Sequence, residues 1–421
     1  MMRMTRLILV FLIMTALSIP VPASGVDLEV NSDTYLHLFQ VDQPVGQDTD
    51  HAHLFEYISL EMVKVGNRPE LSLHVNGWTR LSLADETGDD TAQSSLSSAY
   101  AYYRYNDNRG QVKLGRFLLT EGTSFEAMDG VHLKQSFGRV GFSLFGGSPN
   151  SDGASENKRG NLLTGTRAFI LSPGRFEMGL SYLTEDGDFV GEEREEAGTD
   201  LWIRPTRNME ITGQILYNLT TSGLASDDIS LLVKVSSNVE VTLGSSGYSY
   251  GDLFQAVTNP AFSESLINPD DEVRVLTGRV QWRPVPRFNL FGTVRSTDHK
   301  EDDPGDTDRS EIGLNITFPG FVEKIGLQTA VQSGDQPENE YSEIRGFAML
   351  ASGSLTFSLD AAAMMYGEQI SGEDQGLQVV GSAGWTPSGS LSISGDLRLT
   401  ESPVFEEDVA VVLRANYLFE N

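Results

Sequence analysis

The feature that most constrains this chain is a repeated alternation of apolar and polar residues. In PELSLHVNGWTRLSL (Pro69–Leu83), leucine and valine occupy nearly every second position, and Ser, His, Asn and Arg stand between them. About 22 such runs, each of roughly 9 to 14 residues, follow one another along the chain. A period of two is the pattern of a β-strand with one apolar and one polar face. The chain therefore predicts an all-β fold.

The connections between these runs alternate between long acidic segments and short turns. DETGDDTAQSS (Asp85–Ser95) and TEDGDFVGEEREEAG (Thr184–Gly198) are long, whereas NDNRG (Asn106–Gly110) and TPSGS (Thr386–Ser390) are short and rich in turn residues. Alternating strands joined in this way are typical of a transmembrane β-barrel. We predict a single transmembrane antiparallel β-barrel of about 22 strands, with 20 to 24 allowed, short periplasmic turns and long acidic extracellular loops.

The N-terminal residues have the composition of a secretory signal peptide. Arg3 and Arg6 form a basic region, an apolar run follows from Leu7 to Ile19, and Val21-Pro22-Ala23 offers a cleavage site. About 13 apolar residues are too few for a membrane-spanning helix, which needs roughly 20. We expect residues 1–23 to be cleaved and residues 24–421 to form the barrel.

Composition excludes several classes of function. The 59 acidic residues outnumber the 30 basic ones, which gives a net charge of −29 and disfavours a nucleic-acid partner. The chain has no cysteine, so disulfides, thiolate metal sites and covalent attachment of c-type haem are excluded. The sequence contains no Gly-x-Ser-x-Gly, P-loop or H-E-x-x-H motif. We therefore predict neither a cofactor nor an enzymatic activity.

The polar face of each strand predicts the lining of a pore. If the apolar faces meet lipid, the lumen is lined by charged residues that include Arg80, Arg104, Lys113, Glu210, Arg279, Arg295, Asp396, Arg398 and Arg414. Charges of both signs would set the selectivity of a polar channel. The alternative is that they pair across neighbouring strands and merely fill the bore. Strict alternation from Leu114 faces Arg116 toward lipid, so we expect a bulge or a turn toward the lumen there.

Aromatic residues predict the membrane interface and a constriction. Trp202, Trp282 and Trp385 each precede a short turn. At a membrane–water interface, an indole ring lies in the apolar region while its N–H group bonds to water. We therefore predict an aromatic girdle at these turns. The long connection from Gly251 to Glu272 is comparatively apolar. It carries Phe254 and Phe262, which makes it the candidate constriction loop. An extracellular lid is the alternative.

Two features resemble metal sites only in part. His51 and His53 share one face of a strand, as a pair of ligands would, but surface histidines without that role are more common. The acidic segments Asp85–Asp90, Glu185–Glu196 and Asp298–Asp308 offer carboxylates to divalent cations, yet solvated loop charge explains them more simply. No metal site is predicted.

These features together resemble the Gram-negative outer-membrane porin-like β-barrels. GQVKLGRFLLTEG (Gly110–Gly122) is similar to a strand-plus-Gly-Arg motif of porin-type barrels. VAVVLRANYLFEN (Val409–Asn421) is similar to the terminal strand that the barrel-assembly machinery reads. On this likeness, Tyr417 and Phe419 would form the assembly signal, although Glu420 and Asn421 follow them. The resemblance implies a location in the outer membrane, contact with its lipid and assembly by that machinery.

The predicted function is passive diffusion of small hydrophilic solutes or ions through a polar lumen. The alternative is a barrel that insulates or holds a partner, such as a periplasmic multihaem cytochrome in an electron conduit. An outer-membrane hydrolase would need Ser, His and Asp residues clustered at one rim, and the sequence does not indicate such a cluster. Ion conductance of the purified protein would separate the channel from the sheath.

Overall fold

The computed structural model describes residues 26–41, 49–83, 92–107, 109–150, 161–186, 193–254, 271–300, 305–370, 372–403 and 405–420. Within these ranges the chain forms 22 β-strands. The first eleven are β1 (Asp27–Val41), β2 (Thr49–Val63), β3 (Leu71–Ser82), β4 (Ala92–Tyr105), β5 (Gly110–Glu121), β6 (Ser124–Phe137), β7 (Val140–Pro149), β8 (Leu162–Ser172), β9 (Phe176–Asp186), β10 (Arg194–Thr206) and β11 (Met209–Asn218).

The remaining strands are β12 (Gly223–Lys234), β13 (Val239–Ser249), β14 (Glu272–Trp282), β15 (Phe288–His299), β16 (Thr307–Thr317), β17 (Val322–Gly334), β18 (Tyr341–Ser352), β19 (Leu355–Ile370), β20 (Glu373–Ser388), β21 (Leu391–Ser402) and β22 (Phe405–Glu420). The helical segments are short: α2 (Tyr250–Phe254) and the 3-10 turns η1 (Val65–Asn67) and η3 (Pro337–Asn339). No helix among the described residues is long and apolar enough to cross a membrane.

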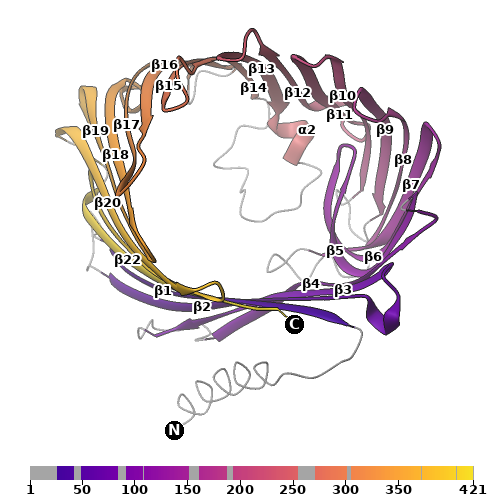
Figure 1. The fold of residues 1–421 in the computed structure, drawn as a ribbon. Coiled ribbons are helices and arrows are strands. Elements are labelled where there is room, and N and C mark those ends of the chain that lie inside the picture. The colour runs from indigo at the N-terminus through magenta and orange to yellow at the C-terminus, as the bar shows by residue number, and fades with distance from the viewer. Residues whose placement is uncertain are drawn as a thin grey trace.

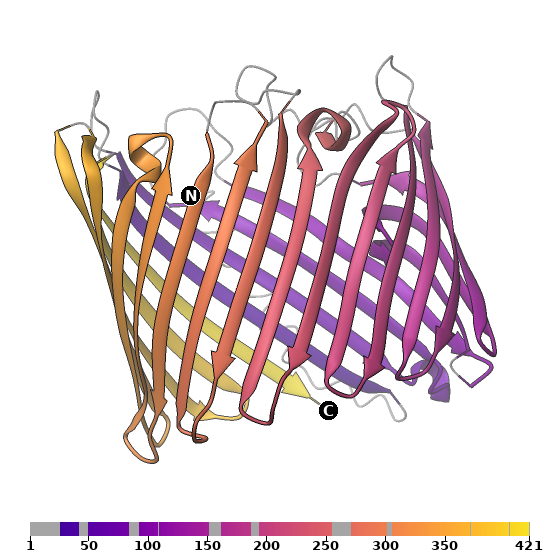
Figure 2. The same cartoon turned by 90° about the horizontal axis from the view of Figure 1, so that it is seen from above.

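The strands form one closed antiparallel barrel. Each strand pairs with the next along the chain, and β1 also pairs with β22, from Glu29 opposite Glu420 to Val41 opposite Asp408. Figure 1 looks along the barrel and shows this ring of strands, and Figure 2 shows their common tilt from the side. Closure gives every strand a neighbour on both sides, so the barrel has no edge strand whose backbone N–H and C=O groups lack partners. The predicted fold and strand number are confirmed.

The two rims of the barrel differ in their connections. At one rim all the turns are short, and left-handed residues close several of them, such as Asn106 and Asp107, both at φ 55°. The strict alternation of long and short connections does not hold at the other rim. There β5–β6, β11–β12, β19–β20 and β21–β22 are also joined within a few residues.

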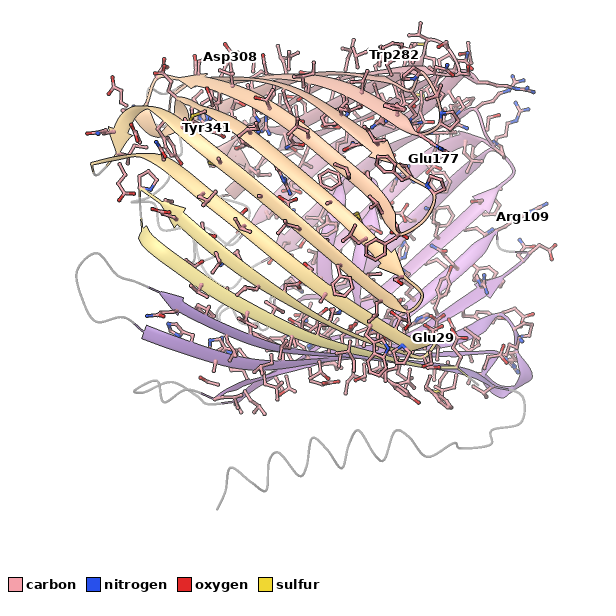
Figure 3. The ribbon with its side chains drawn as sticks, turned by 60° about the vertical axis from the view of Figure 1, so that its left-hand side comes forward. Glu29, Arg109, Glu177, Trp282, Asp308 and Tyr341 are labelled. Carbon is pink, nitrogen blue, oxygen red and sulfur yellow. The ribbon has the colours of Figure 1, made fainter. Side chains whose placement is uncertain are left out.

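The strict period of two gives the wall an apolar outer face and a polar inner face. On β14, Leu276, Val280 and Trp282 point outward and are about half exposed. Thr277, Arg279 and Gln281 point inward from the same strand. Figure 3 shows Trp282 on the outside of the wall and Glu177 and Tyr341 on the inside.

One hairpin leaves the wall and enters the lumen. The ladder between β4 and β5 ends at Ala99 opposite Arg116, and β6 pairs with β7 only as far as Met128. Beyond these points β5 and β6 pair only with each other, around the tight turn at Gly122 and Thr123. This segment, residues 117–128, is called the hook below. Figure 1 shows it inside the ring, beside β9 and β10.

Glycines allow the sharp bend at the base of the hook. Gly115 has φ 125°, and a Cβ built there would lie 2.2 Å from the carbonyl oxygen of Ala99. On the paired strand, a Cβ at Gly130 would lie 2.3 Å from the carbonyl oxygen of Gly146. The chain does turn toward the lumen next to Arg116, but the turn begins beyond this residue and does not bring its side chain into the lumen as expected. The Arg116 side chain itself stays on the outer side and binds both carboxylate oxygens of Asp129, at 2.7 and 2.8 Å.

We expect Gly115→Val to weaken the barrel. A valine at this positive φ costs about 1–3 kcal/mol of strain, before the clash with Ala99 is counted. The urea midpoint of the refolded protein measures the loss. Gly381→Ala is the matched control, because an added Cβ there meets no atom within 4 Å and its φ is ordinary. Equal midpoints for the two variants would contradict the role given to Gly115.

Candidate functional site: a hairpin folded into the lumen

The underside of the hook packs on the inner wall through a small hydrophobic core. Phe117, Leu119 and Met128 on the hook are fully buried. They lie against three buried residues that point inward from the wall, Phe145 on β7, Leu163 on β8 and Leu183 on β9. Each such side chain contributes about 1.5–3 kcal/mol when removed from water. The hook is thus held in place by burial.

Arg167 on β8 anchors the tip of the hook. Its guanidinium contacts Glu121 of the hook at 3.1 Å, Asp200 on β10 at 2.5 and 3.0 Å, and Glu177 on β9 at 2.9 Å. The Cζ atom of Arg167 lies over the Phe169 ring, 4.9 Å from the ring centre. The side chains of Arg167 and Glu121 are only 4% and 3% exposed, so this pair is isolated from water. One arginine on β8 therefore links the hook to two further strands of the wall, β9 and β10.

Glu121 also contacts the base of its own hairpin. Lys134 Nζ lies 2.9 Å from Glu121 Oε1, and His132 Nε2 lies 3.3 Å from Glu121 Oε2. Both residues lie on the part of β6 that remains in the wall. These contacts require the hook to fold back over the inner face of β6. The cations around Glu121 also balance the buried negative charge.

A second arginine fastens the other strand of the hook. Arg194 on β10 binds Glu196 through two parallel contacts of 2.7 and 2.8 Å and also donates to Glu126 of the hook. Thr123 N at the tip lies 3.4 Å from Ser181 Oγ on β9. The hook is thus attached at its tip and along both strands, which holds it in one position.

The side of the hook opposite its buried core faces the lumen. Leu118 and Phe125 point away from the buried core and are 46% and 68% exposed. An apolar surface of the hook therefore faces the lumen, whose inner wall carries many charged side chains.

All nine charged residues predicted to line the pore lie on the inner face of the wall. They are Arg80 (β3), Arg104 (β4), Lys113 (β5), Glu210 (β11), Arg279 (β14), Arg295 (β15), Asp396 and Arg398 (β21), and Arg414 (β22). Some pair across neighbouring strands: Arg414 contacts Asp33 at 2.8 Å, and Arg398 contacts Asp408 at 2.7 Å. Such pairing is the alternative that the sequence left open. A role in conduction stays a prediction.

Other members of this set contact rings rather than carboxylates. Arg279 lies 4.6 Å from the centre of the Phe291 ring, and Lys113 lies 5.8 Å from the centre of the Tyr100 ring. Within the described residues, Arg80 and Arg295 have no carboxylate within ion-pair distance. Their charges are therefore not compensated by a carboxylate of the described wall.

The predicted tryptophan girdle is only partly correct. Trp282 and Trp385 point outward near the short-turn rim and are each 47% exposed. Trp202 points inward, because it shares the face of Asp200 on β10, and Arg204 lies 5.2 Å from the centre of its ring. Glu210 accepts from the same Arg204 at 3.1 Å. Trp202 therefore belongs to the lumen and not to the girdle.

The remaining predicted residues are placed as follows. Tyr417 and Phe419 lie on the outer face of β22, and their role in assembly stays a prediction. Phe254 ends α2, which reaches inward from the rim, whereas Phe262 lies outside the described residues, as do residues 1–23. His51 and His53 lie on the inner face of β2. No group of three or more potential ligands in the described parts of the chain is arranged to hold a metal ion.

No protein-family model and no curated protein matches the sequence. Solved structures of similar fold include the following two. The siderophore receptor PirA from Pseudomonas aeruginosa matches with a TM-score of 0.53 and 12% identity, over 92% of this chain and 80% of that chain. The translocation pore of the P pilus usher PapC matches with a TM-score of 0.50 and 9% identity, over 93% and 99%. The chain has the outer-membrane β-barrel fold. At this identity the likeness extends to the fold alone.

Proposed function

We propose that the protein is an outer-membrane channel through which small hydrophilic solutes or ions diffuse passively. The observation that carries the proposal is a closed barrel with an apolar outer face and a charged inner face, narrowed by an anchored hook. A barrel of this many strands encloses a lumen too wide for wall side chains alone to fill. The hook narrows it without adding a separate domain.

The anchoring of the hook favours a permanent constriction over a movable gate. Opening it would separate the buried pair of Arg167 and Glu121 and expose the core around Met128. Exposing even one of the three buried hook side chains costs about 1.5–3 kcal/mol, which would make an open state rare. The size limit for solutes is therefore set by the hook and the facing wall.

Planar-bilayer conductance of the refolded protein tests the proposal. We expect stable ohmic steps at all moderate voltages, and a reversal potential in a salt gradient that reports the ion preference of the inner wall. Heat-modifiable migration on gels serves as the control for folding. A folded barrel that stays electrically silent would overturn the channel and favour the sheath.

The other assignments follow from this proposal. Residues 1–23 would direct export, the outer face would contact lipid, and the barrel-assembly machinery would insert the strand that carries Tyr417 and Phe419. The channel would act without catalysis. The sheath around a multihaem cytochrome rests on barrel size alone, and the hook occupies space that such a partner would need.

A further inference from the structure

An unbroken series of aromatic rings lies on the inner face of β1 and β2. It consists of seven residues, here called the ring track: Tyr35, His37, Phe39, His51, His53, Phe55 and Tyr57. Centres of successive rings are between 4.6 and 6.4 Å apart. The residues are neighbours because the register places His37 opposite His53 and Tyr35 opposite Phe55. This surface is not needed to close the barrel.

The ring track has two platforms of parallel rings. Phe39 and His51 stack with an angle of 16° between their planes, and Phe55 and Tyr57 stack with an angle of 15°. Phe39 belongs to the first platform, and Tyr35 lies opposite Phe55 of the second platform. Phe39 and Tyr35 are four residues apart on β1, so the platforms are separated by about 14 Å along the strand. Tyr57 at the inner end is 45% exposed to the lumen. The spacing matches a ligand of several linked rings better than a single small molecule.

Polar groups border the track on both sides. Toward β22, Asn416 Nδ2 donates to Asn31 at 2.7 Å and to Asp33 at 2.9 Å. Toward β3, Arg80 lies opposite Phe55 and Trp78 opposite Tyr57. Amides, a carboxylate and a guanidinium beside flat rings are suited to a ligand with apolar faces and hydroxyl groups around its edge.

Most of the charge beside the track is already compensated within the wall, although Arg80 has no carboxylate within ion-pair distance among the described residues. Arg414 lies 5.1 Å from the centre of the Tyr35 ring, but its charge is compensated by Asp33 at 2.8 Å. Arg398 is likewise compensated by Asp408 at 2.7 Å. A charged ligand would have to displace one of these partners at Arg414 or Arg398, whereas Arg80 can donate its N–H groups to the hydroxyl groups of a neutral ligand. Hydroxyl groups can instead share the existing donors and acceptors.

From these observations we infer that the ring track binds the pyranose rings of short neutral oligosaccharides as they pass through the lumen. The C–H groups on the faces of a sugar ring would stack on the aromatic platforms, and its hydroxyl groups would bind the bordering side chains. Stacking tolerates different rings because it depends on flat faces rather than on fixed hydrogen bonds. This inference rests on the proposed channel and names its substrate class.

Current block by maltotriose tests the inference. We expect maltotriose to reduce the ion current in a saturable way, and the variant Phe55→Ala/Tyr57→Ala to raise the half-saturating concentration by about tenfold or more. Tyr341→Ala is the matched control, since it removes a ring on β18 that packs on Tyr366 at 5.8 Å, outside the track. It should leave the block unchanged.

The outcomes separate the inference from the channel itself. An open pore that maltotriose does not block, or blocks equally in the track variant, overturns the inference and leaves the channel standing. Block by benzyl alcohol without block by maltotriose means that the track takes aromatic solutes, which also overturns it. If the barrel is silent, maltotriose binding is measured by tryptophan fluorescence. We then expect a saturable change that Trp78→Phe removes, and its absence overturns the inference.

Discussion

Replacing Arg167 with leucine is expected to destabilise the barrel by about 3–5 kcal/mol, because it leaves Glu121 buried without its main partner. Glu121 is 3% exposed, and water cannot take over the lost contacts while the hook stays in place. The remaining Lys134 compensates the charge only in part. The urea midpoint of the refolded protein, converted to free energy of unfolding, measures the effect.

Two further variants distinguish this mechanism from a general loss of charge. Arg345→Leu breaks a comparable pair with Asp360, but the two side chains are 46% and 30% exposed, so we expect a loss within about 1 kcal/mol. Adding Glu121→Gln to Arg167→Leu should recover part of the stability, because the unpaired buried charge is removed. Equal losses for Arg167→Leu and Arg345→Leu would contradict the anchoring role.

Removing the hook is expected to increase single-channel conductance by about twofold or more, because it lies in the water-filled cross-section. The change replaces residues 117–128 by a short glycine-rich turn between Arg116 and Asp129. The excision exposes Phe145, Leu163 and Leu183. In a second form of the deletion, these three residues are also replaced by serine to prevent aggregation. The conductance of both forms is recorded.

The matched control is a deletion that leaves the lumen unchanged. Deleting residues 368–374 shortens the outer tip of the β19–β20 hairpin, beyond the last regular pair at Met365 and Gln375. We expect its conductance to equal that of the unaltered protein. If hook removal leaves conductance unchanged in both forms, then the narrowest part of the passage lies elsewhere, and the Gly251–Glu272 connection becomes the next segment to shorten.

Local alternation was sufficient to predict the barrel and the facing of its charged residues. A period of two is a property of each strand on its own, so Arg279 and Asp396 were assigned to the inner face without knowledge of their neighbours. Trp202 differs from the other two tryptophans because it precedes a short turn, as they do, but has the period of the inner face of its strand. Counting from Asp200 would have placed it inside.

The hook could not be predicted in the same way. Its strands alternate and its turn is tight, so a hairpin in the lumen resembles a hairpin in the wall. Two signals were present: Phe117, Leu118 and Leu119 are apolar on both faces, and glycines recur at Gly115 and Gly130. The ion pairs that anchor the hook could not be predicted from the sequence, because Glu121 and Arg167 come from strands that are not neighbours.

The seam between β1 and β22 determines when this protein can become stable. Until β22 arrives, the sheet has two long unsatisfied edges, and every backbone group along them is a template for misassociation. The pairing that removes both edges joins residues nearly 400 positions apart, such as Asp33 and Asn416. Such a contact is slow to form and cannot be replaced by any local one. The barrel therefore gains its stability in a single late step, and the chain must be kept soluble until then.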